Sequence, residues 1–274
     1  MLELTSWPFA AALAVVGGAG LVGGLVWLIQ RDIRDKHDLP PERYRGPSVL
    51  LLLFLAVVVG NLLALIPLFG QVAGGDGLTD MGPGTVAALL LLTPLVFGAV
   101  VVVFVLRPRA LAGLRLTDGP RTGRTFAVGV ALGGAGWVVA TLLSLVLSKV
   151  YEAVTGSPPV EEQLVVDLAA QLPPLVAVLL VGILAPVAEE LFFRGVALNA
   201  WEREYGTTRA VLGTTVLFTA AHVVGGPLLA LPPIFLLGLM LGLAYVRWRS
   251  LPLNVGLHAT FNGISLALLF AGVS

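Results

Sequence analysis

Charged residues that could catalyse hydrolysis lie at the end of a long apolar stretch of this sequence. Glu189 and Glu190 follow the apolar run 173–188, and Arg194 stands four residues after Glu190. Charge is costly inside a bilayer, so ionisable groups within an apolar segment usually mark a functional site. A carboxylate held there suits a general base that takes a proton from water. The segment therefore predicts acid–base chemistry within a membrane.

The spacing predicts different surroundings for the two glutamates. Residues four apart share one face of a helix, so Arg194 is expected to pair with Glu190. Glu189 points about 100° away from Glu190 around the helix, which leaves it as the freer carboxylate. The alternative for this group is a structural ion pair that only joins two helices.

Two further polar pairs follow in later apolar segments. His222 lies four residues after Phe218, whose ring can pack against the imidazole, and His258 lies four residues before Asn262. An imidazole N–H and an amide N–H could stabilise an oxyanion. The alternatives are an interfacial histidine and ordinary hydrogen bonds between membrane helices.

The order of these pairs resembles a known family. Glu189-Glu190-x-x-x-Arg194, Phe218-x-x-x-His222 and His258-x-x-x-Asn262 are similar to the motifs of the CPBP family. This is the CaaX-protease and bacteriocin-processing group of intramembrane proteases, also called ABI. The resemblance covers about residues 170–272 and implies a cavity among the motif helices.

The resemblance also implies a division of roles. The residues implied to act in catalysis are Glu189, His222, His258 and Asn262. The first glutamate and the first motif histidine would activate a water, and the second histidine and the asparagine would hold the oxyanion. The residues implied to support them are Glu190, Arg194 and Phe218.

A metal is left open at this stage. The family is commonly labelled a metalloprotease family, and Glu189, His222 and His258 could hold Zn²⁺ or another divalent metal. The H-E-x-x-H pattern of soluble zinc proteases is absent from the sequence. We favour direct activation of water by the glutamate.

The composition predicts an integral membrane protein. The 274 residues are 57% hydrophobic and only 12% charged, against about 25% charged in soluble domains. A net charge of zero argues against a nucleic-acid partner. Without cysteine, the chain has no disulfide, no thiol nucleophile and no cysteine-ligated zinc.

The apolar segments predict an all-α, polytopic fold with about eight transmembrane helices, since each crossing needs about 20 apolar residues. The predicted spans are Pro8–Ile29, Ser48–Leu68, Thr85–Leu106, Thr125–Leu147, Pro173–Ala200, Arg209–Val224, Leu228–Val246 and Asn254–Val273. Every lysine and arginine except Lys149 lies in or beside alternate connections. The positive-inside rule then predicts a cytoplasmic-membrane protein with both termini outside the cytoplasm.

These spans suggest three regions. Residues 1–147 form an N-terminal four-helix membrane region, 148–172 an outer-side and amphipathic connection, and 173–274 the catalytic region. The glycine pair Gly133-Gly134 is expected to allow close helix contact.

The leading hypothesis is an intramembrane endopeptidase. Its partners would be membrane lipid and a peptide or protein substrate, with lipid modification of the substrate left open, as is the oligomeric state. The alternative is a non-catalytic immunity or scaffold protein that keeps the polar cluster. A transporter with a proton-relay carboxylate is less favoured, because no paired broken helices recur in both halves.

Overall fold

The computed structural model describes residues 82–105, 114–159, 169–222 and 228–272, which form helices without any strand. The predicted all-α class holds for this part of the chain, whereas the predicted spans Pro8–Ile29 and Ser48–Leu68 lie outside it.

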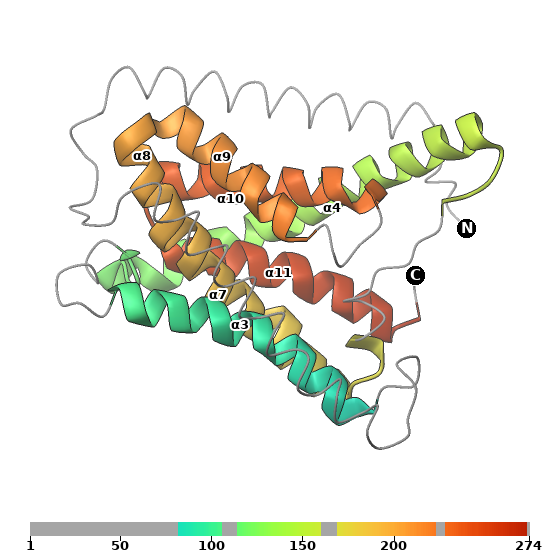
Figure 1. Cartoon of the computed structure of the whole chain (residues 1–274), viewed down its shortest axis with the longest axis horizontal. Coiled ribbons are helices and arrows are strands. Elements are labelled where there is room, and N and C mark those ends of the chain that lie inside the picture. Colours follow the sequence, from blue (N-terminus) through green and yellow to red (C-terminus); the bar gives the residue numbers. More distant parts are fainter. Residues whose placement is uncertain (1–81, 106–113, 160–168, 223–227, 273–274) are drawn as a thin grey trace.

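The main α-helices, traced in Figure 1, are α3 (Pro83–Val105), α4 (Thr122–Thr155), α6 (Pro174–Ala177), α7 (Ala185–Glu190), α8 (Asn199–Tyr205), α9 (Thr207–Ala221), α10 (Leu231–Trp248) and α11 (Leu251–Phe270). Two π-helical segments, η3 (Val178–Leu184) and η4 (Leu191–Leu198), and two short 3₁₀ turns, η2 (Gly119–Arg121) and η6 (Leu228–Ala230), complete the set.

Within the described residues, four helical runs are long and apolar enough to cross a membrane. They are Gly119–Thr155, Pro174–Tyr205, Leu228–Trp248 and Leu251–Phe270. Each contains most of one predicted span, and α3 covers nearly all of the predicted span Thr85–Leu106. The structure thus supports a multi-pass membrane protein. Because α4 continues to Thr155, the first residues of the predicted connection 148–172 belong to this helix.

The predicted span Arg209–Val224 corresponds to α9, which is too short to cross a membrane by itself. α9 ends at Ala221 and has 15 residues, which reach about 22 Å and fall short of the roughly 30 Å hydrocarbon layer. It starts directly after Gly206, whose positive φ of 84° reverses the chain between α8 and α9. The apolar residues of α9 serve burial in the protein, since Val211 and Phe218 belong to the core.

The run Pro174–Tyr205 is one continuous helix whose hydrogen-bond pattern changes along its length. The short α-helix α7 carries the two glutamates and is flanked by the π-helical η3 and η4. Pro186 lies in the first turn of α7. Its nitrogen has no hydrogen to donate to the preceding turn, so a change of pattern at this point is expected. π-Helical turns inside α-helices are frequent at functional sites.

Glycines on α4 bring this helix into backbone contact with α11. A Cβ added to Gly129 would lie 2.0 Å from the carbonyl oxygen of Leu253, and one added to Gly133 would lie 2.3 Å from that of Leu257. The expected close contact is therefore present at Gly133. Its neighbour Gly134 faces open space, since no atom lies within 4 Å of its added Cβ. We call this contact the α4–α11 glycine seam.

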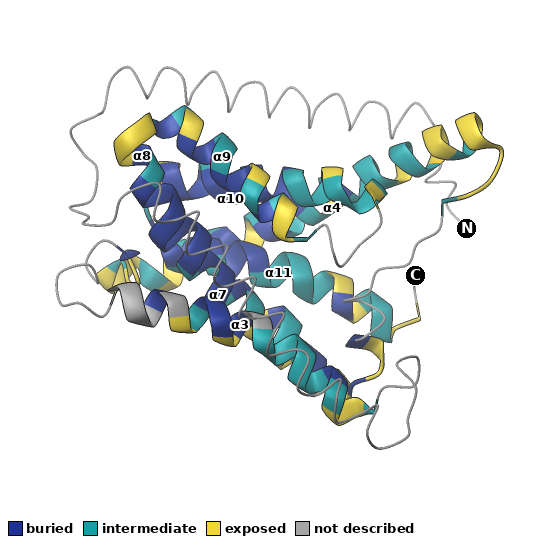
Figure 2. Cartoon of the chain, viewed as in Figure 1, coloured by how far each residue is buried: buried dark blue, intermediate teal, exposed yellow. Residues whose placement is uncertain are grey.

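The buried residues gather where α7, η4, α9, α10 and α11 meet, as the dark blue ribbon in Figure 2 shows. Phe192, Phe193 and Phe218 stack edge to face in this core, with ring centroids 5.1 and 5.2 Å apart. In contrast, apolar side chains such as Val138 and Val154 are exposed on α4. An exposed apolar surface on a long apolar helix is the surface expected against lipid.

Candidate active site

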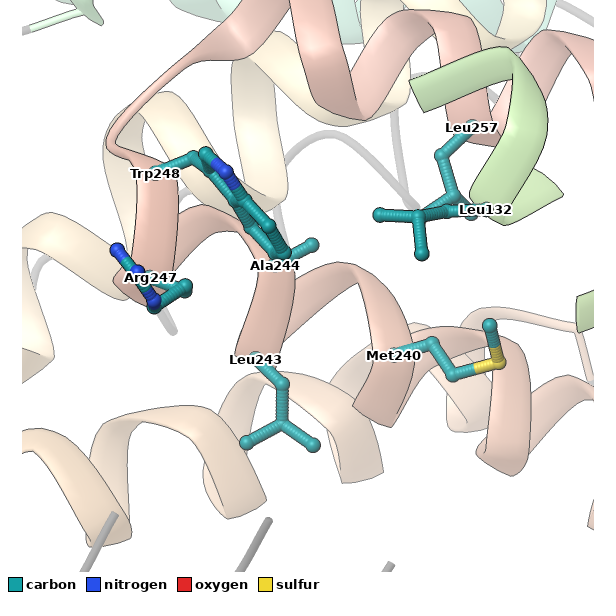
Figure 3. Close-up of a pocket in the computed structure, with 7 residues that line it drawn as sticks. All are labelled: Leu132, Met240, Leu243, Ala244, Arg247, Trp248 and Leu257. Carbon is teal, nitrogen blue, oxygen red and sulfur yellow. The ribbon is translucent and has the colours of Figure 1, made fainter. Parts of the chain in front are cut away.

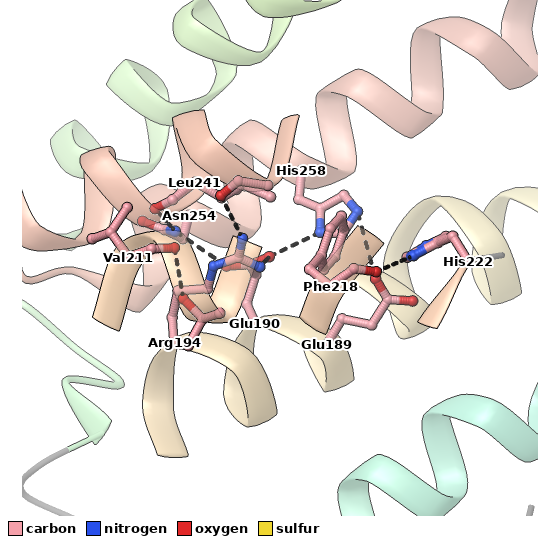
Figure 4. A network of polar contacts seen from close by, with 11 residues as sticks. Glu189, Glu190, Arg194, Val211, Phe218, His222, Leu241, Asn254 and His258 are labelled. Atoms are coloured by element: carbon pink, nitrogen blue, oxygen red, sulfur yellow. Dashed lines mark hydrogen bonds and ion pairs between the residues drawn. The ribbon is translucent and has the colours of Figure 1, made fainter. Parts of the chain in front are cut away.

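Glu190 is the most enclosed acid of the site. It is 0% exposed, and three side chains contact its carboxylate (Figure 4). Oε1 accepts a hydrogen bond from Arg194 Nη1 at 2.9 Å and lies 2.9 Å from Nδ1 of His258. Oε2 accepts one from Nδ2 of Asn254 at 3.1 Å. The expected ion pair with Arg194 is thus present, and Glu190 is bound on both oxygens.

Arg194 contacts three neighbouring groups through its guanidinium. It is fully buried, and its Nη2 donates to the carbonyl oxygen of Gly238 on α10 at 2.9 Å. The guanidinium carbon also lies 4.9 Å from the centre of the Phe218 ring, within cation–π range. A buried cation needs such partners, because an unpaired one would be very costly. The arginine therefore links η4 to α9 and α10.

Glu189 has a different environment from its neighbour. Its side chain keeps 11% of its accessible surface, and its Oε2 lies 3.8 Å from Nε2 of His258. That separation exceeds a normal hydrogen bond. Among the described residues, no side chain or backbone group donates a hydrogen bond to Glu189. As predicted, it is the freer of the two carboxylates.

His258 stands between the two glutamates. Nδ1 faces Glu190 Oε1, and Nε2 faces Glu189 Oε2. Because an ionised carboxylate can only accept, the hydrogen on Nδ1 is donated to Glu190. The second nitrogen of a neutral ring then has a lone pair directed at the space beside Glu189.

His222 approaches the same region from the end of α9. Its Nδ1 donates to the carbonyl oxygen of Phe218 at 2.7 Å, which leaves Nε2 as an acceptor in the neutral ring. The ring centre of Phe218 lies 4.7 Å from that of His222 and 5.7 Å from that of His258. The two imidazoles therefore flank one aromatic ring, and Figure 4 shows His222 pointing toward the side of the site that holds Glu189.

Asn262 lies one turn beyond His258 on the same face of α11. Its Nδ2 donates to the carbonyl oxygen of Val181 in η3 at 3.0 Å. An amide nitrogen has two hydrogens, so one remains available for another acceptor. The structure thus directs Asn262 toward the glutamate-bearing helix, while its contact there is with the backbone.

Asn254 is a site residue that we did not predict. It is fully buried one turn before His258, and its Nδ2 contacts both Glu190 Oε2 and the carbonyl oxygen of Leu241, the latter at 2.8 Å. Asn254, His258 and Asn262 therefore form a stripe along α11, with successive members four positions apart. The same spacing that indicates the His258 and Asn262 pair could have revealed it.

The described side chains do not fit the predicted metal set of Glu189, His222 and His258. Catalytic zinc sites use three protein ligands. Within the described ranges, no group of three or more His, Asp or Glu residues is placed to hold a metal ion. The metalloprotease label is therefore not supported by the arrangement of these residues.

A cavity of about 390 Å³ lies between α4, α10 and α11 (Figure 3), and neither Glu189 nor Glu190 lines it. Leu132, Met240 and Leu257 give it an apolar wall, and Arg247 is the charged residue that lines it. A lining without a carboxylate or an imidazole offers no general base. Hydrolysis at this cavity is therefore not indicated.

Apolar membrane-length helices around a buried polar cluster define a multi-pass membrane protein with an internal polar site. Comparison with protein families adds the class. Residues 171–264 match the family model described as type II CAAX prenyl endopeptidase Rce1-like. The match over this segment confirms the resemblance given by the three motifs. All seven predicted site residues lie within it.

A curated protein of Escherichia coli described as an "uncharacterized 24.3 kDa protein" is 40% identical over 98 residues. The match covers 35% of this chain and 44% of that relative, so the chain spans less than half the length of the relative it matches. No solved structure matches the chain.

Proposed function

We propose that this protein is an intramembrane endopeptidase that hydrolyses a peptide bond with a glutamate-activated water. The observation that carries the proposal is the contrast between two adjacent carboxylates. Glu190 is enclosed and bound on both oxygens, whereas Glu189 keeps some exposure and an unfilled hydrogen-bonding capacity. A pair of acids held in opposite surroundings is a common mark of a hydrolytic site.

In the proposed reaction, Glu189 removes a proton from a water whose oxygen attacks the carbonyl carbon of the substrate. His222 accepts a hydrogen bond from that water through Nε2 and so orients it. The tetrahedral intermediate then collapses, and Glu189 returns the proton to the leaving nitrogen as the C–N bond breaks. General acid–base catalysis of this kind contributes about 10²- to 10⁴-fold in rate.

The negative oxygen of the intermediate needs donors. The second amide hydrogen of Asn262 is one, and His258 becomes another when its ring is doubly protonated, because its Nδ1 hydrogen is already used by Glu190. Donors enclosed by low-dielectric walls act more strongly than they would in water. In this scheme, Glu190 and Arg194 hold His258 in place.

The surroundings of the site and the matching family support a proposal for the substrate class. A site among apolar helices fits a peptide segment that is itself in or at the membrane. The description of the matching family adds a prenylated C-terminal tail as the first substrate to test. We propose the membrane-associated peptide as the class and the lipid group as one variant of it.

The test uses the purified full chain in lipid vesicles with two quenched fluorescent peptides, one prenylated and one carrying a plain transmembrane anchor. Glu189→Gln should reduce kcat at least 10²-fold. Glu204→Gln is the matched control, because Glu204 is exposed on α8 of the same helical run and should leave cleavage unchanged. Equal cleavage by the wild type and Glu189→Gln would refute Glu189 as the base, and no cleavage of either peptide by the wild type would favour a non-catalytic role.

A further inference from the structure

We infer that Asn254 is a positioning residue that fixes Glu190 and, through it, sets the orientation and tautomer of His258. The inference deepens the proposed function, and its kinetic part rests on that function. Asn254 is fully buried on α11 and touches neither Glu189 nor His222. It can therefore act on the proposed chemistry only through the residues it holds.

The first step is the anchoring of the amide. Nδ2 of Asn254 contacts the carbonyl oxygen of Leu241 at 2.8 Å and Glu190 Oε2 at 3.1 Å. Its two amide hydrogens are thus directed at one backbone acceptor on α10 and one carboxylate oxygen on α7. This ties three helices together at the level of the glutamates.

The second step is the division of the Glu190 oxygens. Because Asn254 contacts Oε2, the plane of the carboxylate is fixed and Oε1 is presented to both Arg194 and His258, each at 2.9 Å. Without the amide, the carboxylate could turn and give both oxygens to Arg194, since a guanidinium and a carboxylate favour bidentate pairing.

The third step is the effect of Glu190 on the imidazole ring of His258. The contact with Oε1 requires the hydrogen of the neutral ring to be on Nδ1, which directs the lone pair of Nε2 toward Glu189. A ring released from Glu190 could rotate or exchange its tautomer. Asn254 therefore decides which nitrogen of His258 faces the water site.

The chain suits a direct spectroscopic test, because it has only three histidines. With ¹⁵N-labelled histidine in the full protein, Asn254→Leu should shift the Nδ1 and Nε2 signals of His258 and leave those of His222 and His37 in place. Single replacements of each histidine assign the signals. Asn254→Ser, whose hydroxyl is too short to reach both acceptors, serves as a second variant.

Asn199→Leu is the matched control. Asn199 is as deeply buried and donates to the carbonyl oxygen of Gly195 and to the hydroxyl of Tyr245, at 2.9 and 2.8 Å, two contacts that involve neither Glu189 nor Glu190. Its replacement should cost similar stability but leave the His258 signals unchanged. Unchanged His258 signals in both Asn254 variants would overturn the inference. Failure of both variants to fold while Asn199→Leu folds would also overturn it and assign Asn254 to fold stability.

The kinetic readout separates this inference from the proposed function. Loss of a residue that orients a metal ligand costs about 10- to 100-fold in metal sites, and we expect kcat to fall by a similar factor in Asn254→Leu with KM nearly unchanged. If Glu189→Gln is inactive but Asn254→Leu keeps the wild-type kcat, only the positioning role fails. If Glu189→Gln cleaves like the wild type, the proposed function fails, and the histidine signals alone decide the role of Asn254.

Discussion

Arg249 donates two hydrogen bonds to Glu202, from Nη1 to Oε2 at 2.5 Å and from Nη2 to Oε1 at 2.7 Å. The pair joins the residue that ends α10 to α8, the last part of the helical run that carries the glutamates. Glu202 is 2% exposed and also accepts a hydrogen bond from Thr207. A two-point contact between a buried carboxylate and a partly buried guanidinium should help hold α8 and α10 in register beside the site.

Arg249→Ala should therefore destabilise the protein strongly, by about 3–5 kcal/mol, because it leaves Glu202 buried without its counter-charge. Lys149→Ala is the control, since Lys149 pairs with Glu152 at 2.9 Å on an exposed part of α4. Exposed pairs contribute about 0–1 kcal/mol. Thermal unfolding in detergent, followed by circular dichroism, measures both. Equal losses in the two variants would contradict the assigned role of the buried pair.

The α4–α11 glycine seam allows a test with adjacent residues. Gly133→Ala places a methyl group against the backbone of Leu257, and this overpacking should cost about 1–3 kcal/mol. Gly134→Ala places the same group in open space and should stabilise the helix by up to about 1 kcal/mol. The two melting temperatures, measured side by side, should move in opposite directions. A lower melting temperature for Gly134→Ala alone would show that the seam is wrongly placed.

The two glutamates should respond differently to the same substitution. Glu190→Gln leaves Arg194 charged and buried without a counter-charge, which should cost about 3–5 kcal/mol. Glu189→Gln should change the melting temperature little, because no described residue donates a hydrogen bond to this carboxylate, yet it should abolish cleavage. Melting temperature and kcat are measured on the same preparations. A stable Glu190→Gln beside an unstable Glu189→Gln would reverse the roles assigned to the pair.

Removal of divalent metal should leave the activity unchanged. The arrangement of the described histidine and acidic side chains does not supply three ligands for one ion, and the proposed base is a free carboxylate. The protein is dialysed against a chelator, assayed, and then analysed for bound zinc by elemental analysis. A stoichiometric amount of zinc that is lost together with cleavage would replace the proposed mechanism with a metal-dependent one.

Local spacing predicted the parts of the site that depend on a single helix. Glu190 and Arg194 are four residues apart, and the ion pair follows directly from that separation. The closeness of Phe218 to His222 follows for the same reason. Such contacts depend on helix geometry alone, so no knowledge of neighbouring helices is needed.

Contacts between different helices could not be predicted from the sequence. Glu190 and His258 are 68 positions apart, and nothing in the spacing places Nδ1 of His258 on Glu190 rather than on Glu189. The π-helical turns on both sides of α7 were also not foreseen, since hydrophobic periodicity does not separate them from α-helix. α9 was predicted to cross the membrane, although it is too short to do so, because burial in protein and burial in lipid select the same apolar residues.

The glycine seam also restricts how a peptide could reach the carboxylates. At Gly129 and Gly133 the backbone of α4 lies directly on carbonyl groups of α11, with no side chain between them that could swing aside. A chain of ordinary width cannot pass there unless the two helices separate along their length. The seam therefore closes this side of the helix bundle, and in the proposed reaction a substrate would have to reach Glu189 from another side.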